Sequence, residues 1–279
     1  MISALKNSAF VKDVSTLSSG IIVANLLTII ASLFLTRLYT PEEIGYLTFF
    51  NSSAIVLANI FTLGYELAIV IPSKKKIAIK LVYGAFYVLL GFSIFLFLTI
   101  GSLAFIHQVP ELGIPASWLI YLPAGVLLLG CINIAQEWFN RSRKYKLLSV
   151  SKFIQSFFTA LPQILIGFFF LNKIGLLIGF ISGRLLSSLV YICNFIKIKA
   201  KRTRSFSDVK NTLFEFKRYP KYIAPTLIID RLSLEAPYFL ISLFFAESML
   251  GFFSISYRVL SVPLSFLGTA IGQVFFKFL

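Results

Sequence analysis

The sequence predicts an all-α, polytopic membrane helix bundle. Of the 279 residues, 58% are hydrophobic and only 13% are charged, whereas soluble domains contain about 45–50% apolar and about 25% charged residues. A soluble fold could not cover this much apolar surface with so few polar side chains. The same composition excludes a disordered chain, because disorder requires low hydrophobicity. Long apolar segments separated by basic loops lead us to expect about eight transmembrane helices.

These eight helices follow from segment length, because a helix needs about 20 mostly apolar residues to cross a bilayer. They are predicted at residues 15–36, 44–72, 81–106, 117–139, 153–171, 174–196, 222–246 and 250–276. Only Asn172 and Lys173 separate the fifth helix from the sixth, which predicts a tight helical hairpin. The second helix follows a Thr-Pro-Glu-Glu motif, in which Thr40 can cap the helix and Glu43 completes a capping box.

Lysine and arginine are distributed unevenly between the loops. With the N-terminus counted as cytoplasmic, 21 of the 26 lie on the cytoplasmic side and only Arg37 and Lys173 lie outside. The remaining three, Arg184, Arg231 and Arg258, lie inside predicted helices. This asymmetry predicts a multi-pass protein with a cytoplasmic N-terminus. The net charge of +15 is then explained by anionic membrane phospholipid and predicts no nucleic-acid partner.

The loop lengths predict three parts. Residues 1–196 form an N-terminal six-helix membrane lobe, and residues 222–279 form the first two helices of a second lobe. Between them, residues 197–221 are the one substantial polar region. Apolar residues interrupt its basic character, so we expect a cytoplasmic linker that contains an amphipathic helix on the inner membrane surface.

Charged side chains at membrane depth are costly and are therefore functional candidates. The candidate site residues are Glu66, Arg184, Asp230, Arg231, Glu235 and Arg258. Arg231 and Glu235 are four residues apart, so they are expected to share a helix face and to pair. Asp230 points about 100° away from Arg231 and needs another partner, either Arg184 or Arg258. Prolines on both sides of this cluster predict a broken helix that lines a cavity.

Structural interpretations of these charges remain open. The Arg231–Glu235 pair could serve only to hold helices together. Arg258 could extend its long side chain to the membrane interface, and Glu66 could lie at the level of the lipid headgroups. His107 is the single histidine, and Cys131 and Cys193 lie within apolar segments. These residues offer no ligand set for a metal and no catalytic constellation, so we predict no enzyme activity, no metal and no cofactor.

Several motifs resemble a known family. They are Arg37-Leu38-Tyr39-Thr40-Pro41-Glu42-Glu43-Ile44-Gly45, Tyr65-Glu66-Leu67-Ala68-Ile69-Val70-Ile71-Pro72, Gln136 with Trp138 and Arg141, Arg218-Tyr219-Pro220 with Pro225, and residues 251–258 with Pro263. Over residues 15–276 the chain is similar to the bacterial polysaccharide biosynthesis proteins. These are the O-antigen and capsule flippases of the multidrug/oligosaccharidyl-lipid/polysaccharide exporter superfamily.

The resemblance implies a transporter in the bacterial cytoplasmic (inner) membrane. It would move undecaprenyl-diphosphate-linked oligosaccharide from the inner to the outer leaflet for the synthesis of surface polysaccharide such as lipopolysaccharide. Two six-helix lobes would enclose a central cavity that opens by alternating access. A glycan polymerase and a chain-length regulator would be partners. Arg184 and Arg231 would contact diphosphate or sugar, Asp230 and Glu235 would set local charge and carry coupling protons, and Glu66 would join them or brace the first lobe.

Family members usually carry twelve to fourteen helices, whereas eight are predicted here. We therefore expect a truncated product or a chain whose remaining helices come from another chain. Three alternatives stay open from the sequence: a cation-coupled drug exporter of the same superfamily, a fragment or interaction subunit that does not transport, and a membrane-embedded glycosyltransferase or polymerase.

Overall fold

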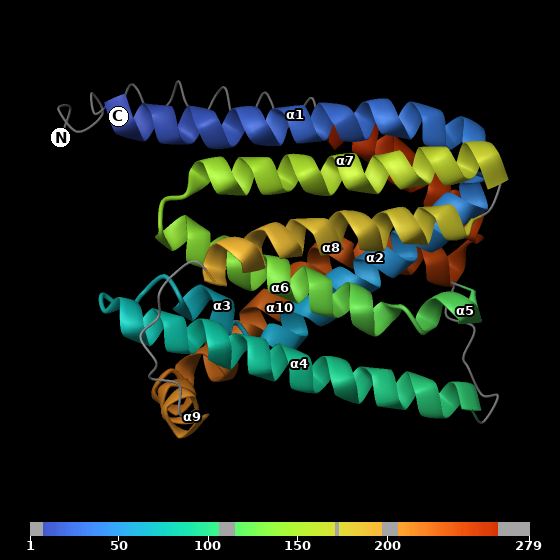
Figure 1. Ribbon diagram of the computed structural model, residues 1–279. Coiled ribbons are helices and arrows are strands. Elements are labelled where there is room, and N and C mark those ends of the chain that lie inside the picture. The colour runs from blue at the N-terminus through green and yellow to red at the C-terminus, as the bar shows by residue number, and fades with distance from the viewer. Residues whose placement is uncertain (1–7, 106–114, 171–172, 197–205, 262–279) are drawn as a thin grey trace.

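The computed structural model describes residues 8–105, 115–170, 173–196 and 206–261. Across these ranges the chain is a bundle of helices without a strand (Figure 1), which confirms the predicted fold class. Within the described residues, six helices are long and apolar enough to cross a membrane. They are α1 (Ser8–Leu38), α2 (Pro41–Thr62), α4 (Lys75–Phe105), α6 (Leu122–Arg141), α7 (Tyr145–Phe170) and α8 (Ile174–Ile196).

The other described helices are shorter or carry more charge. They are α3 (Tyr65–Ala68), α5 (Ala116–Leu119), α9 (Phe206–Glu215), the π-helix η1 (Tyr219–Ile223), α10 (Ala224–Phe244) and a last helix over residues 247–261. Helix α10 has the length of a transmembrane helix but contains Asp230, Arg231 and Glu235. It corresponds to the seventh predicted helix. The eighth, predicted at 250–276, extends into residues 262–279, which lie outside the described part of the chain.

Two predicted helices differ from the structure. The segment 44–72 was expected to be continuous, but Leu63 and Gly64 adopt positive φ angles of 51° and 71°. The turn ends α2 at Thr62 and starts the separate helix α3. The fifth helix was expected from residue 153, but α7 begins at Tyr145. Its first two turns are rich in polar and basic residues, so a prediction based on the length of apolar segments does not include them.

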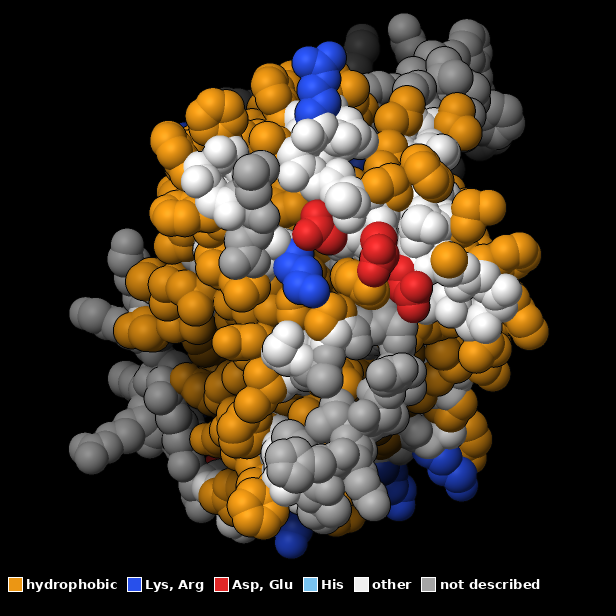
Figure 2. Space-filling view, turned by 90° about the vertical axis from the view of Figure 1, so that its right-hand side faces the viewer, with side chains coloured by type: hydrophobic (Ala, Val, Ile, Leu, Met, Phe, Trp, Pro, Cys, Tyr) orange, Lys and Arg blue, Asp and Glu red, His pale blue; other side chains and the backbone are white. Residues whose placement is uncertain are grey.

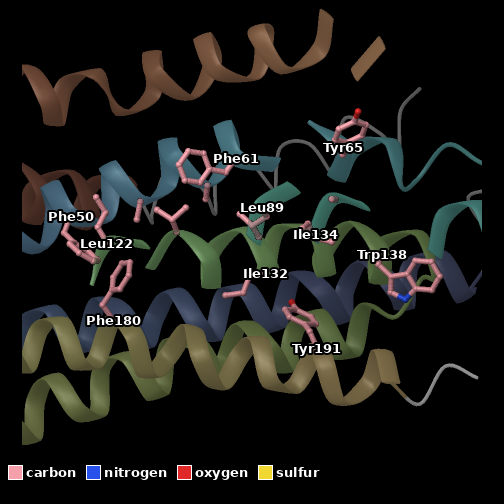
Figure 3. Packing of buried hydrophobic residues seen from close by; sticks show 14 of the residues in the cluster. Phe50, Phe61, Tyr65, Leu89, Leu122, Ile132, Ile134, Trp138, Phe180 and Tyr191 are labelled. Carbon is pink, nitrogen blue, oxygen red and sulfur yellow. The ribbon is translucent and has the colours of Figure 1, made fainter. Parts of the chain in front are cut away.

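Aromatic side chains form much of the core between α2, α4, α6 and α8 (Figure 3). Phe50 packs edge-on against Trp118 and Phe180, with ring centroids 6.3 and 5.2 Å apart. Phe139 stacks on Tyr191 at 5.5 Å. Lipid tails are as apolar as these side chains, so close packing rather than the hydrophobic effect must hold such helices together. The large apolar side chains on the outside of α1, α4 and α7 are correspondingly exposed.

Polar contacts join α7 to α8 and fix the turn between α1 and α2. The Tyr39 hydroxyl, in that turn, donates to the Gln163 carbonyl at 2.8 Å. The Gln163 side chain in turn donates to the Leu176 carbonyl at 3.0 Å. Further along the same helix pair, the hydroxyls of Ser151 and Ser187 lie 2.9 Å apart. These bonds anchor the layer of α1, α7 and α8, which lies beside α2 in Figure 1.

Side chains also fix both ends of the α2–α3 segment. The predicted capping box is confirmed, because the Glu43 amide donates to Thr40 Oγ1 at 3.3 Å and the Thr40 amide donates to Glu43 Oε2 at 3.0 Å. Beyond α3, the guanidinium of Arg141 donates to the carbonyls of Ile69 and Val70 at 3.2 and 2.8 Å. Carbonyls at a helix end otherwise lack an intrahelical partner.

Within the predicted linker, residues 206–215 form the helix α9, and residues 197–205 lie outside the described residues. One face of α9 is buried against α4 and the other is exposed. Lys80 on α4 forms an ion pair with Asp208 at 3.3 Å, and the Tyr65 hydroxyl donates to the Leu213 carbonyl at 3.2 Å. These two contacts therefore attach the linker helix α9 to α4 and α3. The π-helix η1 follows directly, and π-helical turns frequently occur at functional sites.

Candidate functional site

A cavity of about 630 Å³ lies between the first six spans and the C-terminal helices. One wall is built by α1, α2, α7 and α8, and the other by α10 and the helix at 247–261. Small-molecule sites typically occupy about 300–1,000 Å³. The cavity is therefore large enough for a ligand with several polar groups.

Polar side chains reach this cavity because they recur at helical spacing. On α7 the lining residues are Lys152, Gln155, Ser156, Thr159, Ala160 and Gln163. Residues three and four apart share one face of a helix, so this sequence presents a polar stripe. Shorter stripes come from α1, with Asn25 and Thr28, and from α2, with Thr48, Asn51 and Ser52. A polar face turned inward is the arrangement that membrane proteins use for a substrate path.

Arg184 is held rigidly on the α8 part of the wall. Its guanidinium donates to Asn51 Oδ1 at 2.8 Å and to the Phe180 carbonyl at 3.1 Å. The guanidinium carbon also lies 3.3 Å from the centre of the Phe180 ring. The remaining Nε–H is buried and has no hydrogen-bond partner. Two of its contacts fix the plane of the guanidinium, so Arg184 contributes an oriented cation to the cavity wall, and a planar guanidinium suits phosphate groups.

A second cation, Lys152, lines the same wall and interacts electrostatically with Arg184. Arg258 joins them from the opposite wall, and Glu235 is the one acidic residue among the described lining residues. Within the described part of the chain, none of these four charges has an ion-pair partner within 4.0 Å. Unpaired like charges repel one another, and a bound anion would relieve that repulsion. The cavity is therefore suited to an anionic ligand.

The opposite wall is aromatic. Tyr238 on α10 meets Tyr257 edge-on at 6.2 Å, and Phe253 stacks on Tyr257 at 6.1 Å with a 24° angle between the rings. Tyr238 and Tyr257 line the cavity, beside Glu235 and Arg258. Aromatic and charged groups on this wall thus come from two helices that contact each other through these rings.

The structure brings together half of the predicted site residues. Arg184, Glu235 and Arg258 all line the cavity, and Tyr238 and Ser254 lie among them. Their grouping supports the general expectation that membrane-depth charges mark a cavity.

The other predicted residues lie elsewhere. Asp230 and Arg231 are exposed on α10 and do not line the cavity. The predicted ion pair between Arg231 and Glu235 does not form within 4.0 Å. Glu66 is buried in α3, where Oε2 lacks a hydrogen-bond partner, and it interacts electrostatically with Glu137 and Arg231. Its position is behind α2 rather than on the cavity wall.

Lys152 is the main lining residue that the sequence argument missed. It was counted with the cytoplasmic loop because the fifth helix was expected to start at residue 153. A signal was nevertheless present: Lys152, Gln155, Thr159 and Gln163 follow helical spacing within an otherwise apolar segment. That pattern predicts a polar helix face without any knowledge of the fold.

At one end of the bundle the two walls touch directly. A Cβ atom on Gly45 of α2 would meet the Glu247 carbonyl, and one on Gly251 would meet the Pro41 carbonyl. Backbone therefore packs on backbone here. Figure 2 shows acidic and basic side chains gathered on this end among hydrophobic ones. The Tyr46 hydroxyl donates to Glu42, and the Lys173 ammonium lies 6.0 Å from the centre of the Tyr46 ring. The two walls therefore meet at the end of the bundle that carries the α1–α2 turn.

Comparisons with known proteins give one result for the family and one for the fold. A family model described as "Polysaccharide biosynthesis protein" matches residues 34–279, while curated proteins give no match. A solved structure named only as protein A is similar, with a TM-score of 0.65 and 12% identity over 93% of this chain and 62% of that one. The chain thus spans less than two thirds of that structure, and the likeness concerns the fold alone. Because the family model covers most of the sequence, this helical chain belongs to the family of polysaccharide biosynthesis proteins.

Proposed function

We propose that the protein is a flippase that carries undecaprenyl-diphosphate-linked oligosaccharide from the inner to the outer leaflet of the bacterial cytoplasmic membrane. The observation that carries this proposal is the polar cavity between two groups of helices, with Lys152 and Arg184 on one wall and no anion paired to either among the described residues. Family membership supports a role in polysaccharide biosynthesis. A diphosphate matches the surplus positive charge, and the hydroxyls of sugars match the amide and hydroxyl side chains of the cavity.

Transport would proceed by alternating access. The contact of Gly45 with Glu247 and of Gly251 with Pro41 closes one end. With the N-terminus in the cytoplasm, this is the outer end, so the lipid-linked substrate would enter the cavity from the inner side. The C-terminal helices would then pivot on η1 while α9 stays fastened to α4. Helices beyond the length of this chain would complete the second lobe, as the partial coverage of protein A suggests.

The proposal is tested with the purified chain in lipid nanodiscs and in vesicles. Undecaprenyl diphosphate should bind, and Arg184→Gln should weaken binding about 10-fold or more, since one charge-assisted hydrogen bond contributes about 1.5–3 kcal/mol. The matched control is Arg218→Gln, an exposed arginine outside the cavity. A fluorescent polyprenyl-diphosphate oligosaccharide should become accessible in the outer leaflet of vesicles that contain the protein.

The results separate the proposal from its alternatives. Failure of the wild-type chain to bind undecaprenyl diphosphate overturns the proposal. Binding without movement between leaflets favours a fragment that does not transport by itself. Efflux of cationic dyes without an effect on lipid-linked glycan favours the drug exporter.

A further inference from the structure

We infer that the cavity wall built by α10 and the helix at 247–261 is a carbohydrate platform, on which Tyr257 stacks against a pyranose ring, Tyr238 braces Tyr257 edge-on, and Glu235 accepts hydrogen bonds from the sugar hydroxyls. This inference rests on the proposed function and divides the cavity into two subsites. The diphosphate lies on the α7–α8 wall and the sugar on the opposite wall.

The first support is the bracing of Tyr257. Its side chain is 54% exposed and lines the cavity. Phe253 stacks on it one helical turn away, and Tyr238 meets it at an interplanar angle of 86°. Tyr238 also packs on Phe253 at 5.6 Å. The three rings hold one another, so a ligand does not have to fix their conformation when it binds.

The second support is the chemistry of the neighbouring groups. Glu235 lies one helical turn before Tyr238 on α10, and both line the cavity. A carboxylate only accepts hydrogen bonds, whereas a tyrosine offers an apolar face and a polar hydroxyl. A pyranose ring presents an apolar C–H face and a rim of hydroxyl donors. The wall therefore matches the two kinds of surface on one sugar.

The third support is the contrast between the walls. Lys152 and Arg184 belong to α7 and α8, where the lining residues include amides and hydroxyls and one ring, Phe180, which Arg184 covers. A carboxylate beside the diphosphate would repel it. Glu235 instead lies on the opposite wall together with Arg258, so the described part of that wall carries one charge of each sign and no surplus, which suits a neutral sugar. A ligand with an anionic and a neutral part would thus contact both walls at once.

The test compares two lipids on the purified full chain in nanodiscs. One probe is undecaprenyl diphosphate, and the other is the same lipid with one N-acetylglucosamine attached. Tyr257→Leu and Tyr238→Leu should weaken binding of the glycosylated probe about 3- to 10-fold, the range expected for one aromatic contact, and should leave binding of the bare lipid unchanged. Glu235→Gln should show the same selectivity. Arg184→Gln should weaken binding of both probes.

The controls separate stacking from damage to the fold. Phe252→Leu changes an adjacent aromatic residue that is 55% exposed and does not line the cavity, so neither probe should lose affinity. Tyr257→Trp retains an aromatic face and should retain affinity for the glycosylated probe. The inference is overturned if the tyrosine variants weaken both probes equally, or if wild-type protein binds the two probes equally well. Binding of neither probe by the wild type would overturn the proposed function itself.

Discussion

Arg184 on α8 donates a hydrogen bond of 2.8 Å to Asn51 Oδ1 on α2, and this bond crosses the cavity wall between two spans. It fixes the guanidinium against Phe180 and leaves Nε without a partner. One asparagine therefore both links two helices and orients a cation that lines the cavity.

Replacing this asparagine should cost stability. In Asn51→Leu the guanidinium loses its side-chain acceptor, and a hydrogen bond to a charged group contributes about 1.5–3 kcal/mol. We expect a lower melting temperature of the purified protein in detergent. Asn211→Leu, on the exposed face of α9, should change the melting temperature little. Equal melting temperatures for Asn51→Leu and the wild type would contradict the structural role of this bond.

Removing the second cation of the cavity should weaken anion binding without unfolding the protein. Lys152→Gln should lower affinity for undecaprenyl diphosphate about 10-fold, because a charged partner is lost. The matched control is Lys146→Gln, since Lys146 is exposed near the start of the same helix. Affinity is measured by titration in nanodiscs at constant salt. The same loss in both variants would show that general surface charge, rather than the cavity, attracts the ligand.

Widening the contact between α2 and the last described helix should open the closed end. Gly251→Ala places a methyl group against the Pro41 carbonyl, so the two helices must separate. Thr48→Cys, in a background with Cys131 and Cys193 replaced by serine, reports access to the cavity through a membrane-impermeant maleimide. Labelling should be faster with Gly251→Ala than without it. Gly91→Ala serves as the control, because a Cβ there meets nothing within 4 Å. An unchanged labelling rate would argue against closure at this contact.

The stability of the fold should fall as pH rises because of Glu66. Its side chain is 5% exposed in α3, beyond the end of the α2 span, and burial raises its pKa. An acid with a raised folded-state pKa binds more protons when folded, so stability is lost as pH rises above the unfolded value of about 4.3. Glu66→Gln should therefore raise the melting temperature at pH 8 and show a shrinking advantage toward acidic pH. The exposed Glu215→Gln should show no such trend, and a pH-independent difference for Glu66→Gln would refute the assignment.

The sequence predicts the transmembrane helices well because a bilayer demands a long apolar stretch that composition alone reveals. Helix breaks are harder to find. Leu63 takes a positive φ that few non-glycine residues adopt. The following Gly64 is a helix-stop signal, but it lies within a long apolar segment that predicts a continuous span. The start of α7 was not predicted, because its first turns are rich in basic residues and such a composition is typical of a loop.

The site was predicted in part for a geometric reason. Depth along a helix can be counted from sequence, so Arg184, Glu235 and Arg258 were correctly placed inside helices. Which side of a helix faces a cavity depends on how its neighbours pack. Asp230 and Arg231 precede Glu235 by only five and four residues, yet α10 is packed so that Glu235 lines the cavity and the other two do not.

The bond from the Tyr39 hydroxyl to the Gln163 carbonyl has a consequence for biosynthesis. The two residues are 124 positions apart, and ribosomes add about 5–20 residues per second. The first hairpin must therefore remain in the bilayer for about 6–25 seconds before its partner helix is made. During that interval Asn25 and Thr28, which line the cavity in the folded protein, are not yet part of a cavity wall. The side of the N-terminal hairpin that packs on α7 is consequently without its protein partner throughout this interval.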